Sequence, residues 1–328
     1  MSHNIMNNNA FVSVGQPAWH KLGITVDKAM TAEEAIRLGK LDYDVLQTKV
    51  MYETKQGLLG VDNRVVNYNG NTGKPFGVVS NDYKLVQNRE AFGFFDAIIG
   101  DGDAVFQTAG ALKEGQIAFV TAKLPDYIRV AGTDDVTERY LLLSIGHDGK
   151  HSTQAMFTPI RVVCNNTLSA ALTGSSNKVT VYHRGDTKSQ LDQAHKVLGI
   201  SNQLTQELSS IFTVMSKTKI SDEDAIKTIN RQFVTYDELI KIQTGMKTSE
   251  VLSTRKINML KDIRKYYYTG AGQDMETCKG TVFGMYNAVN GYFSNKKTKD
   301  QDKKVTSLYF GNEAKIIDSM FKVSVGMI

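Results

Sequence analysis

The stretch HDGKHSTQAMFTPIRVVCNNTLSAAL, residues 147–172, gathers the residue types that could carry chemistry. His147 and His151 lie four residues apart, a spacing that chelates a metal ion when both side chains share one helical face. The Asp-Gly pair between them is a strong signal for a two-residue hairpin turn, which presents no such face. We therefore interpret both histidines as polar residues of a hairpin tip, where His147, Lys150 and His151 could contact a phosphate.

Cys164 precedes Asn165 and Asn166 at an expected junction between a strand and a helix. A helix N-terminus lowers the pKa of a thiol, but no motif places a histidine base beside this one. We expect a buried structural thiol. The asparagines cap the helix, or their amides bind a phosphate at its N-terminus. Arg161, in the apolar strand, needs a partner, which is an acid inside the fold or a ligand in a groove.

Two groups of basic residues extend this pattern. One closely follows the stretch, and the other, at 255, 256, 261, 264 and 265, lies on an expected helix before three tyrosines. Cations with interleaved aromatic rings suit single-stranded nucleic acid, because cations meet phosphates and rings stack on bases. Solvated helix faces carry the same residue types. The predicted nucleic-acid-binding residues are Lys150, His151, Arg161, Asn165, Asn166, Lys178, Arg184, Lys188, Arg255, Lys256, Arg264 and Lys265.

The motifs of common enzymes are missing from the sequence. It contains no phosphate-binding loop, dinucleotide fingerprint, nucleophile elbow or paired CxxC motif. The carboxylates are scattered along expected helices and form no recognisable metal-binding pattern. We therefore predict a protein without catalytic activity, metal ion or cofactor.

Composition indicates a folded chain in a reducing compartment. The 328 residues are 41% hydrophobic and 22% charged, which suffices for a real core. A net charge of +5 permits a nucleic-acid partner without requiring one. Two distant cysteines make no disulfide framework. The N-terminus lacks the apolar segment of a signal peptide, and no apolar run approaches the roughly 20 residues that span a bilayer. We expect a cytoplasmic protein without membrane contact.

Local patterns predict the elements that position these residues. A capping-box pattern, Thr31 with Glu34, predicts a short helix over 32–38. Residues 43–68 alternate between apolar and polar around two turns, which is typical of meandering strands. An apolar stripe predicts a helix over 89–99. The strands expected after it cover 104–112, 116–124, 139–146 and 152–163.

The sequence thus predicts an α+β fold, in which an antiparallel β-meander packs on helices and an α-helical C-terminal half follows. Residues 1–15 are polar and rich in asparagine, so we expect a flexible N-terminal arm there. The α+β core domain covers 16–184. Helical periodicity dominates from about residue 185, so an α-helical domain covers 185–328.

Several phrases occur together in an order that resembles one family. They are PAWHKLG, TAEEAI, YKLVQNREAFGFFDAIIG, QTAGALKEG, FTPIRVVCNNTLSAAL, GTVFGMYNAVNGYF and SLYFGNEAKI. Over nearly its whole length the chain resembles the phage/plasmid-like protein family, which is named for a domain of unknown function. The resemblance implies a protein of a mobile element in a bacterial cytoplasm, and it supplies no activity.

The order of the elements also resembles the core of the single-strand annealing recombinases. A helix at 89–99 is followed by meandering strands at 104–163 and by a helix from about 165. This resemblance is topological and rests on no motif. It implies a β-β-β-α core, assembly into rings or filaments of identical subunits, and single-stranded DNA held by its backbone in a basic groove between sheet and helix.

These observations lead to three hypotheses. The first is a phage or plasmid protein that binds single-stranded DNA and assists annealing or recombination as a homo-oligomer. The second is a protein-interaction module that acts as a counter-defence or regulatory factor against a host protein; the modest net charge and large helical half favour it. The third is an enzyme that uses Cys164 or His151.

Overall fold

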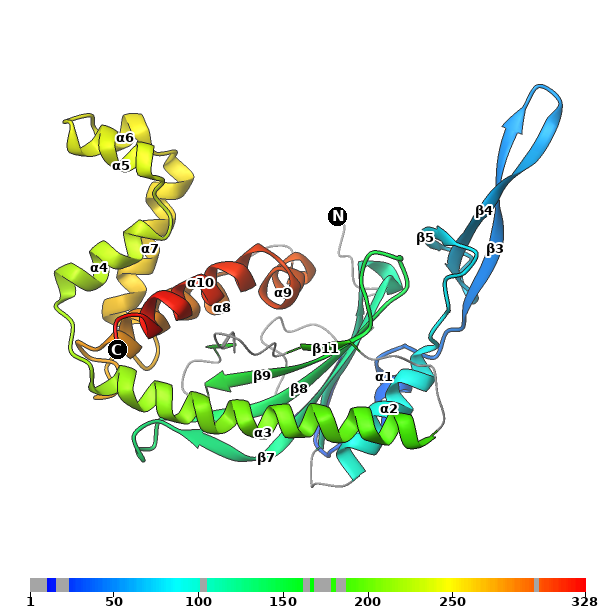
Figure 1. The fold of residues 1–328 in the computed structure, drawn as a ribbon, viewed down its shortest axis with the longest axis horizontal. Helices are drawn as coiled ribbons and strands as arrows, with labels where there is room; N and C mark the ends of the chain where they lie inside the picture. The colour runs from blue at the N-terminus through cyan, green and yellow to red at the C-terminus, as the bar shows by residue number, and fades with distance from the viewer. Residues whose placement is uncertain are drawn as a thin grey trace.

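The computed structural model describes residues 11–15, 24–100, 105–161, 166–167, 178–180, 187–297 and 301–328. Figure 1 shows an elongated molecule with a twisted β-sheet at its centre. A long helix runs beside the sheet, the C-terminal helices gather at one end, and a long β-hairpin projects at the other end.

The larger sheet is mainly antiparallel and contains β1 (Phe11–Val14), β2 (Ile24–Val26), β6 (Val105–Leu112), β7 (Ile117–Arg129), β8 (Val136–Gly146), β9 (Gln154–Arg161), β10 (Asn166–Thr167) and β11 (Lys178–Thr180). The strand order is β10-β9-β8-β7-β6-β1-β2, and β11 also pairs with β9. Strands β6 to β9 pair consecutively and antiparallel, as a meander requires. β1 and β2 pair in parallel.

A second, smaller antiparallel sheet has the order β3-β4-β5 and contains β3 (Val45–Thr54), β4 (Gly57–Asn69) and β5 (Pro75–Ser80). β3 and β4 form the long projecting hairpin of Figure 1. β5 pairs only with the part of β4 nearest the body of the molecule, from Arg64 to Tyr68. The outer part of the hairpin is therefore a ribbon of two strands.

The helices are α1 (Ala32–Leu38), α2 (Asn88–Gly100), α3 (Thr187–Lys217), α4 (Asp222–Arg231), α5 (Tyr236–Gln243), α6 (Thr248–Val251), α7 (Thr254–Thr269), α8 (Val282–Asn295), α9 (Gln301–Phe310) and α10 (Asn312–Val325), with a 3₁₀ turn at Lys113–Gly115. α1 begins with the predicted capping box between Thr31 and Glu34. None of the helices in the described ranges is long and apolar enough to cross a membrane.

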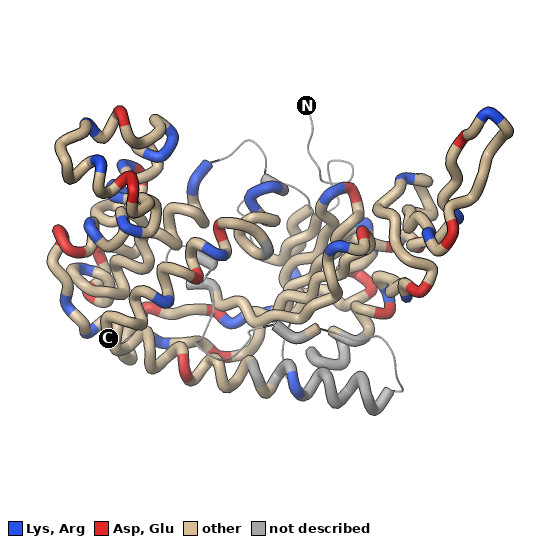
Figure 2. Tube along the Cα trace, turned by 45° about the horizontal axis from the view of Figure 1, so that its top comes forward, with Lys and Arg blue, Asp and Glu red and all other residues tan. Residues whose placement is uncertain are grey.

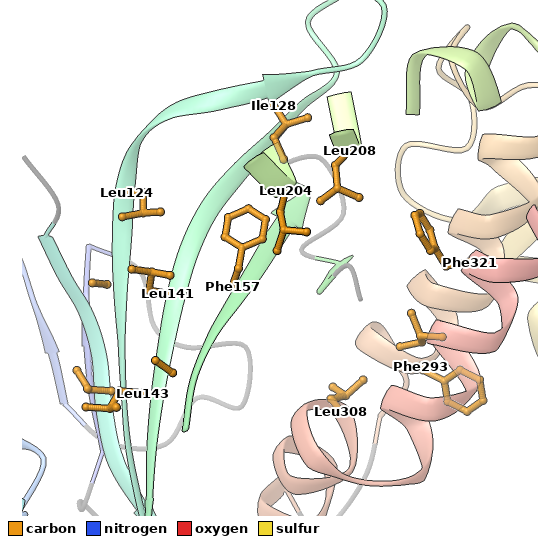
Figure 3. Close-up of a cluster of buried hydrophobic side chains, with 14 of the residues drawn as sticks. Leu124, Ile128, Leu141, Leu143, Phe157, Leu204, Leu208, Phe293, Leu308 and Phe321 are labelled. Carbon is orange, nitrogen blue, oxygen red and sulfur yellow. The ribbon is translucent and has the colours of Figure 1, made fainter. Parts of the chain in front are cut away.

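The core forms because side chains alternate between the two faces of the larger sheet. Leu141 and Phe157 lie in the cluster that also contains Leu204 and Leu208 of α3 (Figure 3). Residues of the opposite parity, such as Leu142 and Met156, lie in a second cluster, against which Tyr309 of α9 packs. The C-terminal half thus contributes α3 to one face of the larger sheet and the side chain of Tyr309, in α9, to the other.

Helix α8 is the centre of the helical half. Nearly all of its residues are buried, as expected for a helix surrounded by others, and it contacts α3, α4, α7 and α10. Its N-terminus is capped by Thr281, whose hydroxyl accepts a hydrogen bond from the backbone N–H of Gly284 at 3.1 Å. A Cβ added at Gly284 would come within 1.9 Å of the carbonyl oxygen of Cys278. Glycine is therefore required there by close packing.

The predicted α+β fold, with helices concentrated in the C-terminal half, is confirmed. Two local expectations need correction. Residues 11–14 of the expected flexible arm form β1, in which Phe11 and Val12 are buried. Asn166 does not cap a helix: it pairs as a strand residue with Arg161, because the chain returns along β9. The long helix α3 starts at Thr187, and residues 168–172 of the helix expected from about residue 165 lie outside the described residues.

Substituting Gly284 by alanine is expected to destabilise the protein by about 1–3 kcal/mol, because overpacking forces the loop before α8 to move. The matched control is Gly199→Ala in α3, where an added Cβ would meet nothing within 4 Å. Alanine should stabilise that helix by roughly 0.5–1 kcal/mol. Denaturant unfolding of the two variants measures both effects. A change in the free energy of unfolding with the same sign in both variants would contradict the packing assigned to α8.

Candidate nucleic-acid interface

His147 is a buried structural residue. Its exposed fraction is 1%, and its Nε2 donates a hydrogen bond to Oδ1 of Asn88 at 2.9 Å. The rings of Tyr43 and Phe76 lie against the imidazole, with centroids 6.3 and 5.7 Å away. Burial lowers the pKa of His147 to about 4, and the nearby Asp148 carboxylate opposes this shift only in part. The expectation that His147 could contact a phosphate is wrong.

The surroundings of His147 form a joint between the two sheets. Nδ2 of Asn67, in β4, donates to the carbonyl oxygen of His147 at 2.8 Å. The hydroxyl of Tyr43 donates to the carbonyl of Gly115 at 2.9 Å, and that of Tyr83 donates to Gly146 at 3.1 Å. The base of the projecting hairpin is therefore fixed to the turn after β8.

The two other predicted residues of this turn, Lys150 and His151, differ in their solvent exposure. The Asp148 side chain accepts hydrogen bonds from the backbone N–H groups of Lys150 and His151, each at 2.9 Å, which holds the turn. Lys150 is exposed. The ring of His151 is half-buried and shares a hydrogen bond of 3.0 Å with the Ser144 hydroxyl. Only Lys150 presents its charge freely to solvent here.

The predicted residues beyond β8 are placed by their backbone alone. Arg161 pairs with Thr137 of β8 and with Asn166 of β10, and Lys178 pairs with Met156. Lys188 lies in the first turn of α3. Cys164, Asn165 and Arg184 lie outside the described residues. A shared surface for this first basic group therefore stays a prediction.

The expected groove between the sheet and its long helix is a packed core. Leu204, Leu208 and Phe212 of α3 are essentially fully buried and belong to one cluster with the sheet residues Leu141 and Phe157 (Figure 3). Side chains packed at this density leave no room for a nucleic-acid strand between the two elements. A nucleic-acid strand is therefore excluded from the space between α3 and the described strands of the larger sheet.

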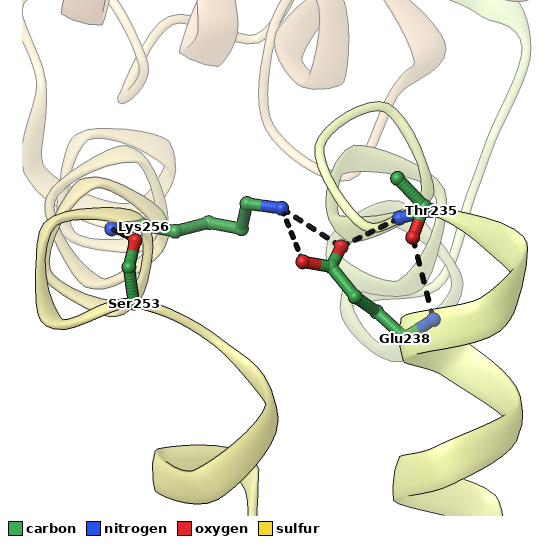
Figure 4. Close-up of polar contacts among 4 residues, drawn as sticks. All are labelled: Thr235, Glu238, Ser253 and Lys256. Atoms are coloured by element: carbon green, nitrogen blue, oxygen red, sulfur yellow. Dashed lines mark hydrogen bonds and ion pairs between the residues drawn. The ribbon is translucent and has the colours of Figure 1, made fainter.

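On α7, Lys256 is held by an intramolecular ion pair. Its Nζ donates to both carboxylate oxygens of Glu238 at 2.8 Å, which joins α7 to α5 (Figure 4). Glu238 also accepts from the backbone N–H of Thr235, at the N-terminus of α5. The ammonium group, followed by this N–H, holds the pKa of Glu238 below its ordinary value. Lys256 is thus already occupied by an acid of the same chain.

The exposed side of α7 carries a cationic stripe, which we define as Lys261, Arg264, Lys265 and Tyr268. Residues three and four apart on a helix are neighbours about 5–6 Å apart, so these four side chains form one patch. All four are exposed, and none of the three cations forms an ion pair with a described residue. Like charges at this spacing weaken a helix by tenths of a kcal/mol, and one carboxylate, the exposed Asp262, lies three residues before Lys265.

The neighbouring tyrosines hold α7 in this orientation. The ring of Tyr266 lies against Gly291 of α8, where an added Cβ would come within 2.2 Å of it. Tyr267 is buried, and its hydroxyl donates to Oδ1 of Asp222 at 2.9 Å. Burial, followed by this carboxylate, raises the pKa of the Tyr267 hydroxyl. Only Tyr268, 49% exposed, can offer its ring to a ligand.

Positive charge is concentrated in the same half of the chain. Residues 187–328 contain 21 Lys and Arg against 15 Asp and Glu, whereas residues 1–186 contain 18 against 19. The whole net charge of +5 therefore comes from the C-terminal half. Figure 2 shows Lys and Arg distributed over this end of the molecule, with acidic residues among them.

The larger sheet carries a polar network that was not predicted from the sequence. Lys123 donates to Oε1 of Glu138 at 2.5 Å, and the Tyr140 hydroxyl donates to Oε2 of the same carboxylate. Burial, followed by this carboxylate, raises the pKa of Tyr140. The three residues come from adjacent strands and satisfy one another, which is a structural role. In the described ranges, no three His, Cys, Asp or Glu side chains gather in a group that could hold a metal ion.

Comparison with known proteins gives one match. The family described as "Domain of unknown function (DUF932)" matches residues 75–309, which is more than half of the chain. The matched region runs from the start of β5 to Tyr309 in α9, and it includes His147 and the cationic stripe but not Tyr43 or Asn67 of the joint. No curated protein and no solved structure matches the chain.

The buried His147 makes stability depend on pH. Its folded-state pKa of about 4 lies below its ordinary value of 6.5, so the unfolded chain binds more protons between these values. The free energy of unfolding therefore loses nothing through His147 above pH 6.5, and it loses about 3 kcal/mol as the pH drops to 4. His147→Gln keeps an N–H donor for Asn88 and should lose this step. Denaturant unfolding of both proteins from pH 4 to 8 measures this loss. If the free energy of unfolding changed with pH equally in both proteins, the assignment to His147 would be contradicted.

Proposed function

Because the chain belongs to the DUF932 family, whose description assigns no activity, we propose its function from its own surface: a non-catalytic protein that binds single-stranded DNA at the cationic stripe of α7. The observation that carries this proposal is the exposed patch of three cations, none of which forms an ion pair with a described residue, beside one exposed ring. Cations neutralise backbone phosphates and release their counterions, and aromatic rings stack on bases.

A single strand fits the stripe better than a duplex does. Stacking on Tyr268 requires a base whose face is accessible, and the bases of a duplex are already stacked on one another. The stripe offers positive charges and one ring, which can contact the phosphates and base faces that every sequence has in common. We therefore expect binding that depends little on sequence and strongly on salt.

One stripe is too small to hold a strand tightly, and this favours a homo-oligomer. Three phosphate contacts to a single strand give a slope of about −2 in log K against log salt, typical of weak binding. Several copies side by side on one strand raise the effective affinity without any new kind of contact. We further propose that the protein assists annealing or recombination in the cytoplasm of a bacterium that carries a phage or plasmid.

The alternative function is a protein-interaction module directed against a host protein. The observation favouring it is the projecting β3–β4 hairpin, which exposes large apolar side chains such as Leu58 and Tyr52. The two functions differ in their response to DNA. A chain that ignores single-stranded DNA at low salt would exclude the first and leave the second.

Neutralising the stripe tests the proposal directly. The triple variant Lys261→Gln, Arg264→Gln, Lys265→Gln should bind a labelled single-stranded oligonucleotide about tenfold or more weakly at low salt. Its salt slope should be smaller by about 2, because three phosphate contacts are lost. Fluorescence anisotropy at several salt concentrations measures both quantities.

The matched control lies on the same helix. Lys256→Gln removes the same charge as Lys265→Gln, but Lys256 is already paired with Glu238. We expect Lys265→Gln to lower the salt slope by about 0.7 and Lys256→Gln to leave it nearly unchanged. Equal effects of the two substitutions would mean that the stripe has no special role.

The exposed ring gives a second, independent test. Tyr268→Ala should weaken binding by about 1–3 kcal/mol if a base stacks on it, with the salt slope unchanged. Tyr267→Phe is the control, since Tyr267 is buried and its hydroxyl only bonds Asp222. That variant should lose stability and keep its affinity. Unchanged affinity in Tyr268→Ala would remove the ring from the binding surface.

A further inference from the structure

The outer part of the projecting hairpin exposes apolar side chains on both of its faces. We define the outer ribbon as residues 49–62 of β3, β4 and the turn between them. Tyr52 pairs with Leu59 on one face, and Glu53 pairs with Leu58 on the other. Leu58 is 67% exposed, and Met51 and Tyr52 are about half exposed. Apolar surface gathered in this way marks an interaction site.

Both edges of the outer ribbon are also open. β3 is the last strand of its sheet, and β5 covers β4 only from Arg64 to Tyr68. No described strand pairs with the outer ribbon on either side. A ribbon of two strands is marginally stable in water, and an open edge is a template for pairing with another strand. A third or fourth strand would therefore stabilise this element.

Hydrogen bonds to the body of the molecule hold the foot of the hairpin. At the foot of the hairpin, Asn67 donates to the carbonyl of His147, and the side chain of Gln87 bonds both the N–H and the carbonyl of Val45 at 2.9 Å. These hydrogen bonds hold the foot of the hairpin to the body. Between the foot and the outer ribbon, the pairing of β3 with β4 shifts register between Lys49 and Met51.

We propose that the outer ribbon is the contact between copies of this chain: the open edge of β3 pairs antiparallel with the same edge of a second copy, about a two-fold axis at Met51. This names the contact of the homo-oligomer in the proposed function and rests on that part of it. In this register Lys49 of each copy lies opposite Glu53 of the other. Val50 lies opposite Tyr52, and Met51 lies opposite itself.

Charge selects this register among the neighbouring ones. An axis at Tyr52 would place Lys49 opposite Lys55, and like charges facing each other across strands are destabilising. An axis at Val50 would place Lys49 opposite Met51 and leave Glu53 opposite Gln47. The axis at Met51 is the one that pairs both charges with opposite ones, twice in each dimer.

The other edge of the ribbon offers no such match. On β4, the charges Asp62 and Arg64 would face each other only about an axis at Asn63. Arg64 is already paired with Ser80 of β5, which closes the edge at that point. The edge of β3 is therefore the self-complementary one, and the pairing creates a four-stranded sheet in the order β4-β3-β3-β4.

The ribbon suits a second copy better than a nucleic acid. Its charged residues are Lys49, Glu53, Lys55 and Asp62, so its formal charge is zero. A neutral, apolar strand has nothing to attract a phosphate backbone. Neither Lys49 nor Glu53 forms an ion pair with a described residue, so both are available to a partner.

The test is a charge exchange followed by sedimentation equilibrium of the full chain without DNA. The unmodified protein should dimerise. Lys49→Glu and Glu53→Lys should each weaken the dimer about tenfold, because two attractive pairs become repulsive. The double variant should regain the original dissociation constant, because the pairs are restored with opposite orientation.

Lys55→Glu is the control, since in this register Lys55 lies opposite the neutral Gln47; it should leave the dimer unchanged. Circular dichroism verifies that each variant is folded. A monomeric wild-type chain, single variants that dimerise normally, or a double variant that stays weak would each overturn the proposal. Oligonucleotide binding by the stripe is measured separately on the same variants, so failure of the ribbon contact and failure of DNA binding are told apart.

Discussion

Helix α3 must bury one apolar stripe against two different partners, and the rest of the architecture depends on this constraint. The helix has 31 residues and is therefore about 46 Å long. Leu204 and Leu208 share a cluster with the sheet, and Phe212 contacts the rings of Phe283 and Phe321 in the helical half. One helix thus carries a single hydrophobic core from the strands to the C-terminal helices.

This core supports two surfaces at opposite ends of an elongated body (Figure 1). At one end α3 fixes α8, and α8 fixes α7 through the contact between Gly291 and Tyr266, so the cationic stripe faces outward. At the other end the buried joint around His147 fixes the foot of the β3–β4 hairpin. Under the proposed function, their separation lets each copy hold a strand at its stripe while its hairpin contacts the other copy of the dimer.

Some features were predictable because they depend on neighbours in sequence. The capping box of Thr31 and Glu34 and the meander from β6 to β9 follow from local patterns that satisfy backbone hydrogen bonds within a few residues. Asn166 was misjudged because the same asparagine can cap a helix or extend a strand. His147 was misjudged because the side chains that bury it, Tyr43 and Asn88, lie 104 and 59 residues away in the chain.

The sequence by itself determined the α+β class, the periodicity of α7 and the excess of positive charge in the C-terminal half, because these are sums or spacings of residue types. Only the tertiary structure decided which cations are free. Lys256 and Lys265 are the same residue on one helix, yet Glu238 of α5 neutralises the first and leaves the second exposed. The physical reason is that a side chain's charge is available only where the fold supplies no opposite charge, and that depends on contacts between distant segments.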